Sequence, residues 1–432
     1  MKLILVELNE INFDAVEHYI NKGVSLPNFK YIIDKGMLTT FAEERYENLE
    51  PWIQWPSVHT GKTYEEHKVF RLGDFVNSKE EQFFEKVENA GYSVGAISPM
   101  NAANNLKDPK YFIPDPWTQT PSDTSFLGRI VTSAVSQAVN ENSQKKLTFK
   151  TLISLVIAFI MLVSPTRFYR MSKYALSSLG KPWRKALFLD MFLHEVHKTL
   201  YKKNNVNFST LFLNAGAHIQ HHYFYNSDFV NSKILKNPKW YIDSNQDPFL
   251  EMLKVYDQIL GDLLTVPSTE LIIATGLSQK PFDELKFYYR LNNHSNFLKD
   301  IGISFKSVFP RMTRDFLVTF DTDQEAKIAS DKLSTILVNG DKKLFGEIDN
   351  RGSELFVILT YPDEILPNTT INIISEDILL QKYVTFVAIK NGEHQSKGFA
   401  YFSDGILDFA PSNNSNISNI HYSVLNFFDI KT

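Results

Sequence analysis

The first 120 residues alternate between two patterns of apolar positions. Unbroken apolar runs at Leu3 to Val6 and Tyr92 to Ile97 predict short buried strands. Asn12 to Lys22 carries apolar side chains at helical spacing, and Leu26 to Gly36 predicts a second helix that ends at its glycine. Such alternation of strands and helices predicts an α/β fold in which a parallel sheet is sandwiched by helices.

The same alternation returns after a long helical stretch. Thr210 to Asn214 and Glu270 to Ala274 predict further buried strands, and Pro248 to Leu264 predicts a helix between them. Residues 121–204 are mainly helical, so we expect a helical cap or insertion there. In 311–362, a strand, a helix and two strands predict a small β-α-β-β subdomain. The predicted mainly parallel core is then assembled from residues 1–120, 205–310 and 363–432.

One apolar run stands out inside the helical insertion. Residues 152–163 are almost wholly apolar and have basic residues on both sides, namely Lys145, Lys146, Lys150, Arg167, Arg170 and Lys173. A helix that spans a bilayer needs about 20 apolar residues, so this run is too short. It suits peripheral contact of a helix with an anionic membrane face. A core helix or a dimer-interface helix is the alternative that we favour.

Composition narrows the function classes. The chain has 432 residues, 22% of them charged, and a net charge of −4, so it has no electrostatic footprint for nucleic acid. It contains no Cys, which excludes disulfides, thiolate metal sites and Cys nucleophiles. With 34 Phe and 19 Tyr, it favours a large core and a stacking surface for sugars or bases. The opening residues Met1 to Glu7 predict a strand rather than a signal peptide, so we expect a cytoplasmic protein.

Candidate chemistry gathers in residues 50–67, which contain two Trp, two His and a Thr60-Gly61 pair followed by His67. We expect a strand-like entry into the Thr-Gly turn, a place that typically seats a ligand group. The spacing resembles the "TG-x-x-P-x-x-H-G" turn of the alkaline phosphatase superfamily, in its type I phosphodiesterase and nucleotide pyrophosphatase branch. The resemblance implies metal-assisted chemistry at phosphorus.

Two further segments are similar to metal-ligand motifs of this superfamily. Asn214-Ala-Gly-Ala-His218 resembles the "D-x-x-x-H" pair, with Asn in place of Asp, and His394 precedes Gly398 as the last His of the family does. Glu7, at the end of the opening strand, stands where the family has its first carboxylate. The resemblance therefore implies one divalent ion, Zn, Mn or Mg, on Glu7, His218 and His394.

Other parts of the family pattern are absent from the sequence. The nucleophile is expected about ten residues before the Thr-Gly pair, where Glu50 to Trp52 offers no hydroxyl. Thr275 to Gln279 lacks the Asp and His of the "S-D-H-G" motif. A complete two-metal centre is therefore not predicted. We expect Glu50 to act as general base or nucleophile, with His59 or His218 as its proton partner.

The predicted substrate side chains are aromatic, amide, basic and imidazole groups: Trp52, Gln54, Trp55, Arg71, Gln220, His221 and His222. The strings "EPWIQW" and "HIQHH" resemble uncharacterised superfamily proteins of bacterial surface-polysaccharide loci. This implies hydrolysis or transfer on a phosphorylated or nucleotide-linked saccharide, at the inner face of the membrane. The alternative is a member that has lost catalysis and binds a glycan or a partner protein. The sequence leaves the oligomeric state open.

A pair of histidines at His194 and His197 resembles a zincin motif that is one residue short. With a spacing of three residues, the two imidazoles cannot bind one zinc ion in the way that the i, i+4 spacing of the zincin motif allows. We therefore expect a solvated helix face at this position.

Overall fold

The computed structural model describes residues 1–140, 149–311, 314–373 and 376–431, and its contacts divide the chain into two compact units. The first unit consists of Met1–Asn231, Ile242–Pro281 and Gly392–Thr432. The second consists of Ser232–Tyr241 and Phe282–Asn391, so it contains 311–362 and extends beyond it on both sides. The helical segment 121–204 belongs to the first unit.

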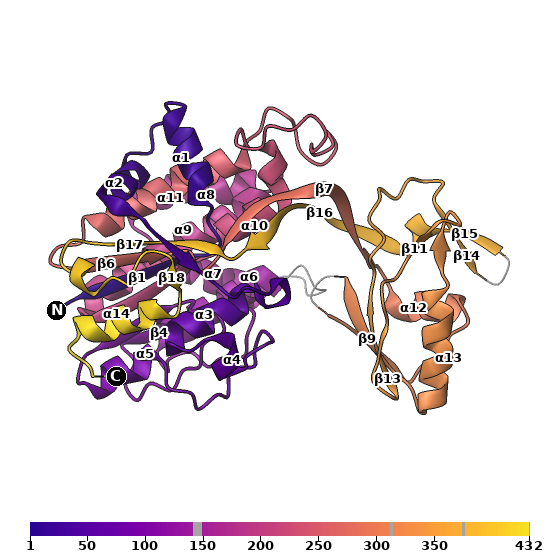
Figure 1. Cartoon of the computed structure of the whole chain (residues 1–432), viewed down its shortest axis with the longest axis horizontal. Helices are drawn as coiled ribbons and strands as arrows, with labels where there is room; N and C mark the ends of the chain where they lie inside the picture. Colours follow the sequence, from indigo (N-terminus) through magenta and orange to yellow (C-terminus); the bar gives the residue numbers. More distant parts are fainter. Residues whose placement is uncertain (141–148, 312–313, 374–375, 432) are drawn as a thin grey trace. The chain divides into compact units, whose positions relative to one another are not determined.

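An eight-stranded sheet forms the centre of the first unit, in the order β18-β2-β17-β6-β1-β5-β3-β4 (Figure 1). Its strands are β1 (Leu3–Leu8), β2 (Leu38–Phe41), β3 (Val94–Ile97), β4 (Tyr111–Ile113), β5 (Phe208–Leu213), β6 (Glu270–Ala274), β17 (Lys397–Phe402) and β18 (Ser415–Asn416). β17 runs antiparallel to its neighbours β2 and β6, and the other pairings in the sheet are parallel. The prediction of an α/β fold with a mainly parallel sheet is confirmed.

Helices cover both faces of this sheet (Figure 1). One face packs against α3 (Pro51–Thr60), α5 (Phe83–Asn89) and α14 (Asn419–Phe427) through a continuous apolar cluster. The other face carries α1 (Phe13–Asn21), α2 (Pro27–Gly36), α9 (Trp183–Asn204), α10 (Ala215–Tyr223) and α11 (Pro248–Leu264). β1 is buried along its whole length because it lies between these two layers.

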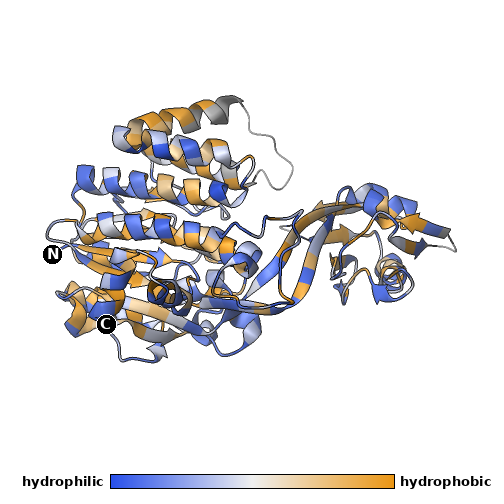
Figure 2. Cartoon of the chain, turned by 90° about the horizontal axis from the view of Figure 1, so that it is seen from above, coloured by the Kyte–Doolittle hydropathy of each residue, from blue (hydrophilic) through white to orange (hydrophobic). Residues whose placement is uncertain are grey.

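The helical insertion contains α6 (Phe126–Asn140), α7 (Phe149–Leu162), α8 (Pro165–Ser177) and α9, and α9 packs on β3 and β5. α7 is coloured hydrophobic along most of its length in Figure 2. Ala158 and Leu162 are buried, whereas Ile160 is 63% exposed and Met161 is 53% exposed. Lys145 and Lys146, which precede this helix, lie outside the described residues. In the described part of the chain, no helix combines the length and the apolar character needed to cross a membrane.

The second unit combines two four-stranded sheets, ordered β12-β13-β9-β8 and β11-β10-β14-β15, with a shared apolar core. Its strands are β8 (Ser307–Pro310), β9 (Asp315–Thr319), β10 (Leu337–Val338), β11 (Lys342–Lys343), β12 (Asp349–Asn350), β13 (Glu354–Ile358), β14 (Thr370–Ile373) and β15 (Glu376–Leu379), and its helices are α12 (His294–Asp300) and α13 (Asp323–Ser334). Two long strands, β7 (Ser278–Leu291) and β16 (Val384–Gln395), pair with each other and carry the chain from one unit to the other.

The segment before the Thr60-Gly61 pair is helical, so the expectation of a strand-like entry is wrong. α3 begins at Pro51, and a proline fits the first helical position because its missing N–H would have no partner there. α3 ends at Gly61, whose φ of 75° is left-handed. A Cβ at this glycine would lie 2.7 Å from Cδ2 of His421, so the close approach of α14 also requires glycine. The short helix α4 (Tyr64–His67) follows.

Candidate metal-binding site

Glu10 lies just beyond the carboxyl end of β1, at the edge where open α/β sheets place their ligands. Its backbone has a φ of 63°, which is uncommon for a residue with a side chain. Two hydrogen bonds hold it there. Its N–H donates to the Thr275 carbonyl at 3.1 Å, and its own carbonyl accepts from the Gln279 N–H at 3.2 Å. The side chain is therefore fixed beside the end of β6, and it is 1% exposed.

Two imidazoles converge on this carboxylate. Oε2 of Glu10 lies 3.1 Å from Nε2 of His221 and 3.1 Å from Nε2 of His394. The two Nε2 atoms lie 3.2 Å apart. Around a tetrahedral zinc ion with bonds of about 2.1 Å, ligand atoms are separated by about 3.4 Å, so this triangle is close to one face of such a tetrahedron. The three residues thus fit a single Zn-type ion with a fourth position left for water or substrate.

The Glu10 carboxylate and the His394 imidazole each stabilise the charged form of the other. Burial raises the pKa of Glu10, but His394 and His221 more than offset it and hold the pKa well below its usual range. For His394, burial lowers the pKa, and Glu10 together with Glu50 outweighs that effect, so the pKa is raised. The cluster is therefore arranged to keep a positive charge, a proton or a metal ion, against the Glu10 carboxylate.

Amide side chains hold Glu10 in this orientation. Nδ2 of Asn9 donates to Oε1 of Glu10 at 3.0 Å and to Oδ1 of Asn214 at 2.8 Å. The indole N–H of Trp55 donates to Oδ1 of Asn9 at 2.8 Å, and the Gln279 amide donates to Oε2 of Glu10. Asn214 and Gln279 follow the strands that supply metal carboxylates in the resembled family. Here their amides take part in a hydrogen-bond network around one carboxylate.

Two further groups border the cluster. Gln220 donates to the Glu10 carbonyl at 2.9 Å and accepts from the Asn12 N–H at 3.1 Å, which ties α10 to the loop after β1. Glu50 occupies the position just before α3, and its Oε2 lies 3.7 Å from Nδ1 of His394. The backbone of Leu49 also acts to raise the pKa of His394.

Of the three residues predicted to hold a metal, His394 lies in the cluster, while Glu10 and His221 stand where Glu7 and His218 were expected. Glu7 lies inside β1, fully buried, with Oε1 3.0 Å from Nε2 of His59. Its position in an apolar run is the sequence signal that it faces the core. Glu7 and His218 belong to neither group of candidate ligands found among the described residues.

α10 explains why His221 rather than His218 reaches Glu10. Residues four apart share a face of a helix, and the rings of His218 and His222 pack together with centroids 4.7 Å apart. His221 is turned about 100° from His222 and faces the end of β1. Burial lowers the pKa of His218 to about 4, so this imidazole is neutral.

The residues of 50–71 that were predicted to bind substrate differ in their exposure to solvent. Trp55 is fully buried beneath Asn9, and Gln54 is buried with its amide donating to a backbone carbonyl at 2.7 Å. Trp52 is partly buried and donates to a backbone carbonyl at 3.2 Å, and Arg71 is exposed. In this segment, Trp52 is therefore the tryptophan that keeps access to solvent.

Ser57, the hydroxyl nearest to the position where the nucleophile was expected, is not arranged as a nucleophile. The Val69 N–H donates to Nδ1 of His67 at 3.0 Å, so the proton of the neutral ring is on Nε2. That nitrogen lies 3.0 Å from Oγ of Ser57 and donates to it, while Oγ donates to the Ile53 carbonyl at 3.3 Å. Burial lowers the pKa of His67 to about 4. His67 therefore does not accept the Ser57 proton.

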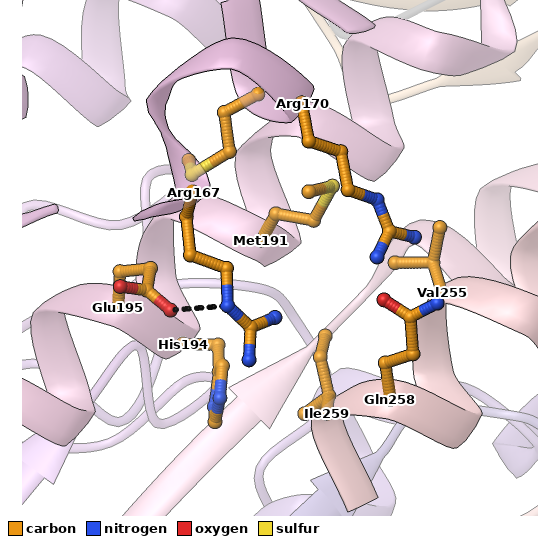
Figure 3. A pocket seen from close by; sticks show the side chains of 9 residues that line it. Arg167, Arg170, Met191, His194, Glu195, Val255, Gln258 and Ile259 are labelled. Carbon is orange, nitrogen blue, oxygen red and sulfur yellow. Dashed lines mark ion pairs between the residues drawn. The ribbon is translucent and has the colours of Figure 1, made fainter. Parts of the chain in front are cut away.

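A second group of candidate ligands consists of His194, Glu195 and Asp262, close to the pocket in Figure 3. Nη2 of Arg167 lies 2.5 Å from Oδ2 of Asp262, and His194 and Lys198 each lie 3.1 Å from the same oxygen. Nε of Arg167 also lies 3.7 Å from Oε1 of Glu195, the ion pair dashed in Figure 3. The two carboxylates are already paired with two fixed cations, so this group does not fit a metal ion.

His194 and His197 are buried, and the expectation of a solvated helix face is wrong. They are 2% and 1% exposed, because α9 lies between the sheet and the other helices of the insertion. Nε2 of His197 lies 2.9 Å from Oγ of Ser209 on β5. The pair therefore contributes to packing and not to a zincin-type site.

No family model matches the chain, and no curated protein matches its sequence. Among solved structures, it is similar to the murine ectonucleotide pyrophosphatase/phosphodiesterase 5, with 11% identity, a TM-score of 0.41, and coverage of 100% of this chain and 96% of that chain. It is also similar to the phosphonoacetate hydrolase of Sinorhizobium meliloti 1021, with 12% identity, a TM-score of 0.43, and coverage of 99% and 96%. It is similar as well to the alkaline phosphatase of the Antarctic bacterium TAB5, with 10% identity, a TM-score of 0.43, and coverage of 100% of this chain and 99% of that chain.

Proposed function

We propose that this protein is a metal-dependent hydrolase or transferase of phosphoryl-linked substrates, with one divalent ion held by Glu10, His221 and His394. The convergence of their three ligand atoms, 3.1 to 3.2 Å apart, supports this most directly. When bound, such an ion acts as a Lewis acid on a phosphoryl oxygen and lowers the pKa of a water molecule. Zinc suits the two imidazoles and the carboxylate best, and Mn or Mg are the alternatives.

Glu50 is the proposed general base. Its side chain is 33% exposed, so it reaches solvent beside the cluster, and it lies next to His394. Its place at the start of α3 also puts the positive end of that helix beside an incoming phosphoryl group. Of the other predicted proton partners, His59 is buried against Glu7, and His218 is partly buried and packs against His222.

The predicted leaving group is a saccharide. Trp52 supports this prediction, because its indole is partly exposed and it follows Glu50 by two positions in the chain. Gln220 and His222 flank His221 on α10 and are the polar groups next to this ligand in the sequence. A cytoplasmic site of action, at the inner face of the membrane, belongs to the same proposal.

Metal content tests the proposal directly. We expect the protein, dialysed after loading with zinc, to retain about one ion per chain by elemental analysis. His221→Ala and His394→Ala should each weaken zinc binding at least about 100-fold, because each removes one of three protein ligands. His18→Ala is the matched control, since His18 pairs with Asp228 on the surface. Equal zinc content in all four proteins would contradict the site.

Turnover tests the reaction class. The zinc, manganese and magnesium forms would be assayed with p-nitrophenyl phosphate and with bis(p-nitrophenyl) phosphate, which separate monoester from diester hydrolysis. We expect release of p-nitrophenol from one of them, and loss of that release in His394→Ala but not in His18→Ala. Zinc binding without turnover of either ester would favour the second candidate function.

That second candidate is a protein that binds a glycan or a partner without catalysis. The arrangement of Ser57 favours it, because this hydroxyl accepts from His67 and is not activated. Asn214 favours it as well, since an amide stands there in place of the carboxylate of the resembled motif. Thr275 to Gln279, which lacks the Asp and His of the second motif, favours it too. The two candidates share the metal site and differ in turnover.

A further inference from the structure

The second unit contains a cavity of about 340 Å³ that the proposed reaction does not use. Three aromatic residues, Trp240, Tyr289 and Phe386, line it together with Glu364 and Gln381. Its volume falls in the range of small-molecule sites, about 300 to 1,000 Å³. All its lining residues belong to the second unit, so it is distinct from the cluster around Glu10.

Trp240 is exposed and yet held in place by other rings. Its side chain is 55% exposed, which is uncommon for so large an apolar group. Its ring centroid lies 5.0 Å from that of Phe386 at an interplanar angle of 78°, and 6.3 Å from that of Phe287 at 25°. Phe386 in turn lies 5.7 Å from Tyr289. Trp240 is thus a supported aromatic surface that borders a cavity and is open to a ligand.

Two polar side chains, those of Glu364 and Gln381, also line the cavity. Among the described residues, neither the carboxylate of Glu364 nor the amide of Gln381 forms a hydrogen bond, although both line the cavity. An apolar ligand would cover these groups without replacing their hydrogen bonds to water, and that carries a desolvation cost. A ligand rich in hydroxyl groups would replace those bonds and still present C–H groups to the indole.

We propose that this cavity binds a neutral sugar ring, stacked on Trp240, with its hydroxyl groups bonded to Glu364 and Gln381. The carboxylate accepts hydrogen bonds from sugar hydroxyls, and the amide both donates and accepts. The negative charge of Glu364 disfavours phosphorylated sugars and uronic acids, because their anionic groups would lie beside the carboxylate. The site stands independently of the metal centre, because no residue is shared between them.

The test uses the full-length protein and three neutral probes: methyl β-D-glucopyranoside, cellobiose and N,N′-diacetylchitobiose. Saturation-transfer NMR reports contact with sugar protons, and titration of tryptophan fluorescence reports affinity. We expect at least one probe to bind, with Trp240→Ala weakening it by about tenfold or more and Glu364→Gln by several-fold. Phe309→Ala is the matched control, since Phe309 is an exposed ring of the same unit outside the cavity and should leave affinity unchanged.

The proposal fails if none of the three probes binds, or if binding is the same in Trp240→Ala as in the control. It also fails if glucuronic acid binds more tightly than the neutral sugars, or if n-octanol binds at Trp240 and no sugar does. If Trp240→Ala does not fold, Trp240→Phe replaces it in the binding experiment, because the phenyl ring fills part of the space of the indole. Circular dichroism of every variant separates loss of the site from loss of structure. Zinc content is measured in parallel, and its loss would concern the metal centre alone.

Discussion

A carboxylate as deeply buried as that of Glu10 must have positive charge beside it. Without that charge, the desolvation cost of an ionised group is several kcal/mol, and the group would take up a proton. Here a proton on His394, or a metal ion held in its place, supplies the charge, and amides from Asn9 and Gln279 supply hydrogen bonds. The site is therefore organised around one residue, and its other groups act by fixing the charge state and orientation of that residue.

Glu50→Gln separates a catalytic role from a positioning role. Glu50 is the proposed base and is not one of the three candidate ligands, so we expect zinc content close to that of the unaltered protein. Turnover of the better p-nitrophenyl ester should fall by about 100-fold to 10,000-fold, the usual contribution of a general base. Unchanged turnover would remove Glu50 from the mechanism. Loss of zinc together with turnover would make Glu50 a positioning residue.

Gln279→Glu tests how the amide network and a metal ion compete at Glu10. The Gln279 amide donates to Glu10 and to the Ala217 carbonyl, and a carboxylate there would place acceptors against acceptors. Without metal, we expect a loss of about 2 kcal/mol or more in the free energy of unfolding. Zinc would relieve the repulsion, so the rise in Tm on adding zinc should exceed that of the unaltered protein. An equal or smaller rise would contradict a metal site beside Gln279.

At the scale of elements, α7 shows how exposure distinguishes residues that the sequence pattern cannot. The run 152–163 is apolar on every side, so it has no periodicity that would reveal a buried face. In the structure, Ala158 is fully buried, while Ile160 is 63% exposed two positions later. Such a helix packs against the rest of the protein through one face, and the side chains on its opposite face contribute little to the free energy of folding.

Ile160→Lys should therefore change the free energy of unfolding by less than about 0.5 kcal/mol, as most surface substitutions do. Ala158→Lys on the same helix is the matched comparison, and it should cost several kcal/mol because it buries a charge. Urea unfolding of the isolated protein measures both. If Ile160→Lys were as damaging as Ala158→Lys, the exposed stripe would be covered by another copy of the chain in solution. Sedimentation of both proteins would then show the change in oligomeric state.

At the scale of the whole molecule, the sequence predicts the sheet better than it predicts the site. Unbroken apolar runs identify β1 and β6, and the rule for open α/β sheets places ligands at their carboxyl ends. The apolar run around Glu7 indicates that this residue faces the core. The pattern could not show that Glu10 points to the ligand edge, because its direction depends on the backbone turn after Leu8, where Glu10 has a φ of 63°. β7 was not predicted, because the residues in its middle are exposed and polar. They form neither an unbroken apolar run nor an alternation of apolar and polar residues.

Buried histidines give the molecule a predictable response to acid. Burial lowers the pKa of five of them to about 3 or about 4, against about 6.5 in an unfolded chain. They are His67, His197, His218, His294 and His421. Between these values the unfolded state binds protons that the native state does not. Their contribution to stability is therefore fully present above about pH 6.5 and is lost as the pH falls through the folded pKa values.

We expect Tm to be nearly constant between pH 7 and 8 and to fall steeply between pH 6 and 4. At pH 5, a fully buried imidazole such as His197 costs about 2 kcal/mol relative to neutral pH. His197→Gln should therefore be less stable than the unaltered protein at pH 7.5, by a margin that narrows at pH 5, because the glutamine has no proton to gain on unfolding. Scanning calorimetry at both pH values measures that margin. A margin that stays constant or widens at pH 5 would mean that His197 is not held neutral in the folded chain.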